Sequence, residues 1–236
     1  IVQSIKLALT IAKSGKPHHA YWNDAKIQIL QLIKNGIALN PHYRKLTPMV
    51  ADELASWEDW SNTMWIWQSV LDSRPNVVAI IVNMAKGQLA LGNVQQALNC
   101  LEKAKRLQPG ATVVRALEAL IQLRTGHFEL ANQGIKKLLS ENAKDYELLF
   151  TAYVIGEQTR DAKLMIRALE LRILHWPKDA PDAWVGLGKI YAFEAAMHDE
   201  AKAVFAFQRA IDSSSLDFRD KTLGKIPTAY HPRLTI

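Results

Sequence analysis

The 236-residue sequence is poor in cysteine, glycine and proline, and it lacks a long hydrophobic run. Its single cysteine, Cys100, excludes an intramolecular disulfide and a cysteine-based zinc site. The 11 glycines and 9 prolines are few for this length, which argues against a turn-rich β-sandwich and against disorder. The longest apolar stretch, residues 1–12, contains Lys6 and is too short to cross a bilayer.

The residues that are abundant favour helices. Alanine, leucine, lysine, glutamine and glutamate recur along the chain, and a hydrophobic fraction of 49% is enough for a sizeable core. The formal charge of +6 favours acidic partners, but no run of five or more basic residues occurs. We therefore expect a solvated surface with a small positive bias and no nucleic-acid partner. The chain begins with Ile1 rather than methionine, which indicates a piece of a longer protein.

Proline recurs at a fixed interval. Pro41, Pro75 and Pro109 are equally spaced, and Pro177 follows after twice the same interval, with Ala143 in the slot between. This interval, about 34 residues, resembles the period of tetratricopeptide repeats, in which each unit is a pair of antiparallel helices and the proline ends the second helix.

Small residues follow the same register. Gly92 and Gly126 are separated by the proline interval, and each follows an apolar run, as expected just beyond a helix C-terminus. Alanines recur at this interval where closely crossing helices leave no room for larger side chains, in the pairs Ala85 and Ala119, and Ala97 and Ala131.

Two segments carry a fuller tetratricopeptide pattern. Residues 91–98, followed by Ala104 and Pro109, match the end of one repeat, and residues 182–191 match an opening helix. Ala203, Phe207 and Ala210 match the small and aromatic positions of the following second helix. They match only if about three residues are inserted between the two helices.

The register predicts an all-α fold, a tetratricopeptide-type solenoid of about five to six helix pairs in a right-handed superhelix over residues 1–215. Residues 216–236, with Pro227 and Pro232, are expected to form an irregular tail. The predicted helices span 1–14, 23–38, 47–57, 60–73, 77–91, 94–107, 112–125, 128–141, 145–158, 161–175, 181–196 and 199–213.

Motifs for catalysis are missing from the sequence. It contains no glycine-rich phosphate loop, HExxH, GxSxG or EF-hand loop. The adjacent His18 and His19 could bind a metal, but a surface pair on a loop is the simpler interpretation. Cys100 has no base beside it in sequence and is interpreted as a small packing residue. The chain alone is therefore predicted to be non-catalytic, without cofactor or metal.

Five of the seven tryptophans lie between residues 22 and 67. The register places Trp60 and Trp67 between repeats, where they are expected to pack in the core. Trp57 and Trp65 are candidates for exposure. An aromatic and basic patch that could stack on sugar rings is predicted from His42, Tyr43, Arg44, Trp57 and Trp65.

A concave groove lined by the first helix of each repeat is the second candidate binding surface. Its polar members are mainly basic, so an acidic or phosphate-bearing ligand is one hypothesis, and a solvated face that binds nothing is the other. The projected groove residues are Lys45, Asp52, Val82, Lys86, Leu89, Arg124, Phe150 and Gln158.

Beyond the repeat, residues 36–48, 60–71 and 73–75 resemble the C-terminal soluble region of bacterial membrane-bound O-antigen ligase and polymerase proteins. The most similar group is the PglL-type protein O-oligosaccharyltransferases. The resemblance covers about a third of the chain, and the later repeats are generic.

This resemblance implies a parent enzyme that moves a glycan from a polyprenyl-pyrophosphate carrier to serine or threonine of periplasmic proteins. The catalytic loops of that family lie between membrane helices that are not present here, so no catalytic residue is carried over. The chain would sit at the periplasmic face of the inner membrane beside the membrane domain of its parent. There it would position an acceptor protein such as pilin, or lipid-linked oligosaccharide. The alternative is a stand-alone adaptor that scaffolds a protein complex.

Overall fold

The computed structural model describes residues 27–28, 30–32, 34–35, 51, 54–55 and 59–235. All regular structure in these residues is helical, without a strand, which confirms the predicted fold class. The predicted helices 1–14, 23–38 and 47–57 lie wholly or mostly outside the described residues. None of the described helices combines the length and apolar character needed to span a membrane.

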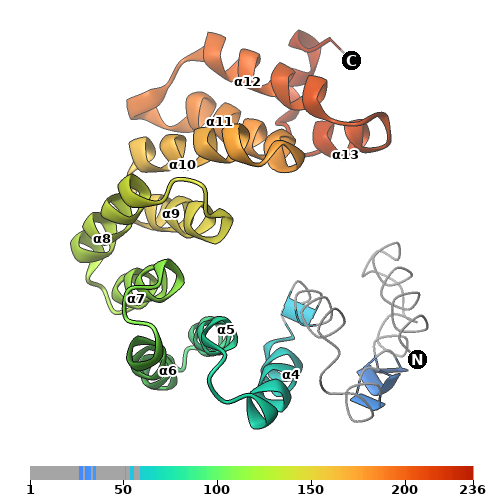
Figure 1. Cartoon of the computed structure of the whole chain (residues 1–236). Coiled ribbons are helices and arrows are strands. Elements are labelled where there is room, and N and C mark those ends of the chain that lie inside the picture. The colour runs from blue at the N-terminus through green and yellow to red at the C-terminus, as the bar shows by residue number, and fades with distance from the viewer. Residues whose placement is uncertain are drawn as a thin grey trace. The chain divides into compact units, whose positions relative to one another are not determined.

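The chain forms two compact units, residues 1–109 and 110–236, which are described separately. In the first unit, α4 (Trp60–Ser73), α5 (Val78–Ala90) and α6 (Val94–Leu107) follow one another (Figure 1). Helix α5 packs against both α4 and α6.

The second unit contains three helix pairs and a C-terminal segment (Figure 1). Within each pair, the two helices pack against each other and are joined by a short connection, as in an αα-hairpin. The pairs are α7 (Thr112–Arg124) with α8 (Phe128–Glu141), α9 (Tyr146–Thr159) with α10 (Ala162–His175), and α11 (Ala180–Phe193) with α12 (Glu200–Ser213).

The helix boundaries repeat with the period found in the sequence. The first helices α5, α7, α9 and α11 start at equal intervals that match the proline spacing, and so do the second helices α6, α8 and α10. Helix α12 starts later than this period requires, because the 3-10 helix η2 (Ala195–Met197) is inserted before it. The predicted insertion between the last two helices is therefore confirmed.

The ends of the second helices share one backbone conformation. The cap residues Arg74, Gln108, Asn142 and Trp176 have φ between −148° and −131° and ψ between 68° and 80°. Each donates its N–H to the carbonyl four residues before it. Proline disfavours the helical conformation of the residue before it, yet Asn142 adopts the shared conformation in front of Ala143. The proline thus favours this geometry, but the fold keeps it without one.

Three of the first helices, α5, α7 and α9, are followed by a residue in the left-handed region, whereas α11 is followed by Glu194, which is extended. Gly92 has φ 79° and Gly126 has φ 82°, and the backbone N–H bonds around both form the Schellman arrangement. These glycines confirm the predicted helix ends. The next position in the period is Arg160, which has φ 55° and is the only described non-glycine residue with positive φ. A side chain with Cβ is strained there, so this repeat carries a local cost that its neighbours avoid.

A polar contact joins α8 to the start of α10. The Asp161 carboxylate accepts hydrogen bonds from the Leu164 N–H at 3.0 Å and from Asn132 Nδ2 at 3.1 Å, and it forms an ion pair with Lys136. Burial raises the pKa of the Asp161 carboxyl, but the bonds from Lys136, Leu164 and Asn132 outweigh burial and leave the pKa below its usual value. The same side chain thus caps α10 and fixes it to the preceding repeat.

Small residues lie where helices cross. Ala85, Ala97 and Ala131 have no exposed surface, and Ala119 is 2% exposed. In the last repeat a Cβ added at Gly188 would overlap the Phe207 ring, which is fully buried. The four alanines are buried, as their predicted place at helix crossings requires, and Gly188 marks a close approach between α11 and α12.

The C-terminal segment differs from the predicted irregular tail. It forms η3 (Leu216–Phe218), α13 (Arg219–Leu223) and η4 (Thr228–Arg233) in the same compact unit. Helix α13 packs against α11 and α12, η4 packs against α12, and η3 packs against α13. Tyr230 is 7% exposed, and its ring centroid lies 4.9 Å from that of Phe207. Residues 216–235 do not continue the helix pairs, and Ile226 and Tyr230 share a core cluster with Phe207, so this segment covers apolar surface of the last repeat. We call residues 216–235 the C-terminal cap.

Polar contacts hold the end of the C-terminal cap. Tyr230 Oη donates to Glu200 at 3.0 Å, and Arg233 pairs with the same carboxylate. The Gln208 side chain bonds both the N–H and the carbonyl of Thr235. These bonds tie residues 228–235 to α12.

Replacing Arg160 with glycine is expected to stabilise the chain by about 1 kcal/mol, because it removes the strain of a Cβ in the left-handed region. Thermal or urea unfolding measures the change. Arg160→Ala keeps the strain and loses the guanidinium, so it serves as the matched control and should give no such gain. Equal stabilisation by both variants would contradict the backbone explanation.

Candidate functional site

About half of the predicted site residues can be placed in the structure. The others lie outside the described residues; they are His42, Tyr43, Arg44, Lys45, Asp52 and Trp57. Those described in the first unit are Trp65, Val82, Lys86 and Leu89, and those in the second unit are Arg124, Phe150 and Gln158.

Two tryptophans of α4, Trp65 and Trp67, divide as predicted, whereas Trp60, which was expected to pack in the core, is half-buried. Trp65 is 40% exposed, and the Lys34 ammonium lies 5.8 Å from its ring centroid. Trp67 is buried in the core, at 6% exposure. Trp65 therefore remains a candidate contact residue, and Trp67 is a structural residue.

Two projected groove residues of α5 are not surface residues. Val82 and Leu89 are buried and belong to the core of the first unit, which corrects their projection onto the groove. Lys86 on the same helix is half-buried. The projection considered only the position of a residue within its repeat. Because α5 is more fully packed than α9, a position that is exposed on α9 is buried on α5.

In the second unit, exposed and partly exposed residues form a stripe along each first helix. On α9 they recur at helical spacing, and Phe150 is 50% exposed although its neighbours Leu148 and Leu149 are buried. The α9 stripe consists of Glu147, Phe150, Val154, Glu157 and Gln158, and the α11 stripe consists of Asp182, Gly186, Lys189 and Phe193. Together with Arg124 at the end of α7, we call these stripes the A-face.

The A-face brings the three predicted residues of this unit onto equivalent helices. Arg124 and Gln158 occupy equivalent positions in successive repeats and lie at the same end of α7 and α9, which pack against each other. The equivalent residue on α11 is Ala192, which is buried, and the next residue, Phe193, is 65% exposed at the end of this helix. Sequence reasoning missed Phe193, because the register points to its buried neighbour.

The charge of the A-face differs from the expected basic groove. Its two cations, Arg124 and Lys189, stand among three carboxylates, those of Glu147, Glu157 and Asp182. In the described part of the groove, a phosphate-bearing ligand is therefore not favoured over a peptide. Two exposed phenylalanines with charges of both signs around them suit an apolar anchor and a polar rim.

An aromatic groove lies between helices of the last two repeats. Its volume is about 330 Å³, and α10, α11 and α12 line it. Trp184 meets Phe205 edge to face with ring centroids 6.0 Å apart, and the Arg209 guanidinium lies 5.9 Å from the Trp184 ring. These contacts occupy the Trp184 ring within the fold, so we interpret it chiefly as a packing residue.

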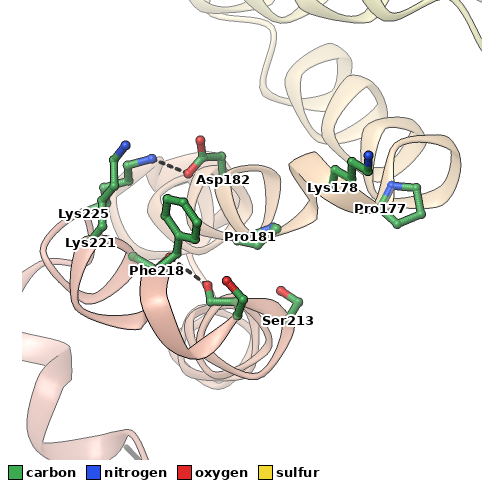
Figure 2. A pocket seen from close by; sticks show the side chains of 11 residues that line it. Pro177, Lys178, Pro181, Asp182, Ser213, Phe218, Lys221 and Lys225 are labelled. Atoms are coloured by element: carbon green, nitrogen blue, oxygen red, sulfur yellow. Dashed lines mark hydrogen bonds and ion pairs between the residues drawn. The ribbon is translucent and has the colours of Figure 1, made fainter. Parts of the chain in front are cut away.

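A pocket with three lysines lies between α11, the end of α12 and the C-terminal cap (Figure 2). Its volume is about 450 Å³. The lining residues are Pro177, Lys178, Pro181, Asp182, Ser213, Ser214, Ser215, Phe218, Lys221, Thr222 and Lys225. We call it the basic pocket. It was not predicted, because part of its wall comes from the segment that was expected to be irregular.

Side chains with reactive potential are few in the described part of the chain. No group of three or more histidine, cysteine, aspartate or glutamate residues there could hold a metal ion. Burial raises the pKa of the Cys100 thiol, and nearby Lys103 lowers it by less. Cys100 is half-buried, as a small packing residue would be.

Among known proteins, the chain is similar to solved structures of tetratricopeptide repeat proteins. No family model and no curated protein matches the chain. A tetratricopeptide repeat protein from Parabacteroides merdae matches with a TM-score of 0.59 and 13% identity, covering 94% of this chain and 83% of its own. A thermophilic tetratricopeptide repeat protein from Thermus thermophilus matches with a TM-score of 0.56 and 15% identity, covering 75% and 95%. With the regular helix register, these matches show that the chain has the tetratricopeptide-repeat fold.

Proposed function

We propose that this chain is a protein-interaction scaffold whose A-face binds an extended peptide segment of a partner protein. The observation that carries the proposal is the exposure of Phe150 and Phe193 on successive first helices, at 50% and 65%. Aromatic side chains of this size are the usual energetic anchors of protein interfaces.

The arrangement of the A-face suits an extended chain. The first helices α9 and α11 each carry an exposed stripe, although the two stripes occupy different positions within the repeat. In this proposal, an extended peptide that crosses the repeats contacts one stripe after the other. Phe150 and Phe193 offer apolar contacts on two stripes, and Arg124, Gln158 and Lys189 surround them with polar groups. A peptide with apolar side chains at intervals and charges between them complements this surface.

Removing the two phenylalanines is expected to weaken peptide binding without unfolding the chain. Peptides selected from a randomised dodecapeptide display library on the chain serve as probes, and their affinity is measured by fluorescence anisotropy. Phe150→Ala and Phe193→Ala should each weaken binding about tenfold, in line with the loss of an interface anchor. Because both side chains are exposed, the change in unfolding free energy should stay within about 0.5 kcal/mol.

The matched control is Phe128→Ala, since Phe128 is 53% exposed but lies on the second helix α8. It should leave the affinity unchanged. Selected peptides that bind the Phe150→Ala/Phe193→Ala double variant as tightly as the original chain would contradict a role for the A-face.

We further propose that this scaffold belongs to a bacterial membrane-bound O-oligosaccharyltransferase and lies at the periplasmic face of the inner membrane. The support is the sequence resemblance of residues 36–48 and 60–71 to that family; the second segment lies within α4, and the first is outside the described residues. In such a parent, the A-face would present a segment of an acceptor protein to the membrane-embedded catalytic site.

The complete reading frame tests this proposal. About ten apolar spans before Ile1 are expected, and in that protein Arg124→Glu should reduce glycosylation of the acceptor at normal membrane abundance. A start codon or a signal peptide directly before Ile1 would contradict the proposal and favour a stand-alone adaptor. The A-face experiment is independent of this outcome, because it uses only the chain itself.

A further inference from the structure

We propose that the basic pocket is a second binding site, which takes an acidic peptide segment of a partner protein. The pocket shares Asp182 with the A-face but has its own three lysines, Lys178, Lys221 and Lys225, in its lining. Three features support this assignment: the pocket has an excess of positive charge, its middle is apolar, and bonds within the chain hold its two sides together.

The charge of the basic pocket is unbalanced. Lys225 is paired with Asp182, and the Lys221 ammonium lies 6.0 Å from the centroid of the Phe218 ring. Lys178 is exposed and forms no ion pair with the described residues. Three ammonium groups thus share one carboxylate in the lining. A ligand that brings carboxylates to Lys178 and Lys221 would balance this charge.

The positions of the lysines favour a ligand longer than a single anion. Figure 2 shows Lys178 at one end of the pocket and Lys221 and Lys225 at the other, with Phe218 and Pro181 between them. A ligand with a single charge matches only one of these ends. A short peptide with acidic residues on either side of an apolar one can place a carboxylate at each end.

The walls between the lysines are apolar. Phe218 is 57% exposed, and two prolines, Pro177 and Pro181, complete this part of the lining. The hydroxyls of Ser214 and Thr222 bond each other at 2.7 Å, so they are already engaged within the chain. An apolar side chain against Phe218 is therefore the best complement for the middle of the pocket, and the lysines are its main donors to a ligand.

The basic pocket is formed before any ligand arrives. The bond between Ser214 and Thr222 and the ion pair between Asp182 and Lys225 join the C-terminal cap to α12 and α11. A preformed site avoids part of the entropy cost of ordering side chains on binding.

The surroundings favour an acidic peptide over a nucleic acid. Aspartates stand on the same elements as the lysines or beside them: Asp182 on α11, Asp212 on α12 and Asp220 on α13. They interrupt the positive surface that a phosphate backbone would need along its length. A peptide of a few residues contacts the lysines without crossing these carboxylates.

The probe for this site is a fluorescein-labelled hexapeptide, Asp-Glu-Leu-Phe-Glu-Asp, whose binding to the whole chain is measured by fluorescence anisotropy at low salt. Lys178→Gln and Lys221→Gln are each expected to weaken binding about fivefold, and the double variant about 25-fold, as for the loss of exposed charge pairs. The control Lys137→Gln/Lys163→Gln removes two exposed lysines outside the pocket and should leave binding unchanged.

A second measurement locates the bound peptide. In ¹⁵N-resolved NMR spectra, the peptide should shift the backbone amides of Lys178, Ser215 and Lys221, and the Phe150→Ala/Phe193→Ala variant should bind it with unchanged affinity. Any of three results would overturn the proposal: equal binding of a peptide with asparagine and glutamine in place of the acids, equal binding by the Lys178→Gln/Lys221→Gln variant, or displacement by inorganic phosphate with the same amide shifts. The last result would mean a simple anion site.

Discussion

The close crossing of paired helices at small side chains is the constraint on which the rest of this structure depends. Ala97 and Ala131 have no exposed surface, and Gly188 leaves room only for the Phe207 ring. Protein interiors are packed to nearly crystalline density, so a crossing point tolerates little added volume. Once these positions are small, each helix pair of the second unit packs on the next pair of that unit, and the C-terminal cap completes the packing around Phe207.

Because of this constraint, the residues that pack the repeats together differ from the exposed residues that are proposed to bind a partner. Alanine recurs at two buried positions of successive repeats, in the pairs Ala85 and Ala119, and Ala97 and Ala131. The stripes that face solvent differ from helix to helix: Phe150 stands on α9 and Lys189 on α11. The A-face can therefore acquire anchors without disturbing the stack. The basic pocket arises differently, because the C-terminal cap adds a new wall beside the last repeat.

Local signals in the sequence were sufficient to predict most of the described helices. Prolines, the glycines at 92 and 126, and the alanine register all act within one repeat, so their period gives the helix ends closely. The C-terminal cap could not be predicted this way, because it depends on the contact of Tyr230 with Phe207 across the turn of the chain, and its short helices carry no periodic pattern. The burial of Leu89 and the basic pocket likewise depend on how whole elements pack.

The most direct test of the crossing constraint is a double-mutant cycle between Gly188 and Phe207. In an unconstrained helix, Gly→Ala stabilises by roughly 0.5–1 kcal/mol. At this crossing, Gly188→Ala is expected to destabilise the chain by about 1–3 kcal/mol, and the loss should shrink in a Phe207→Leu background, where the added methyl group has room. A stabilisation by Gly188→Ala that is equal in both backgrounds would contradict the account, because the two helices would then not be held at the distance that the repeat requires.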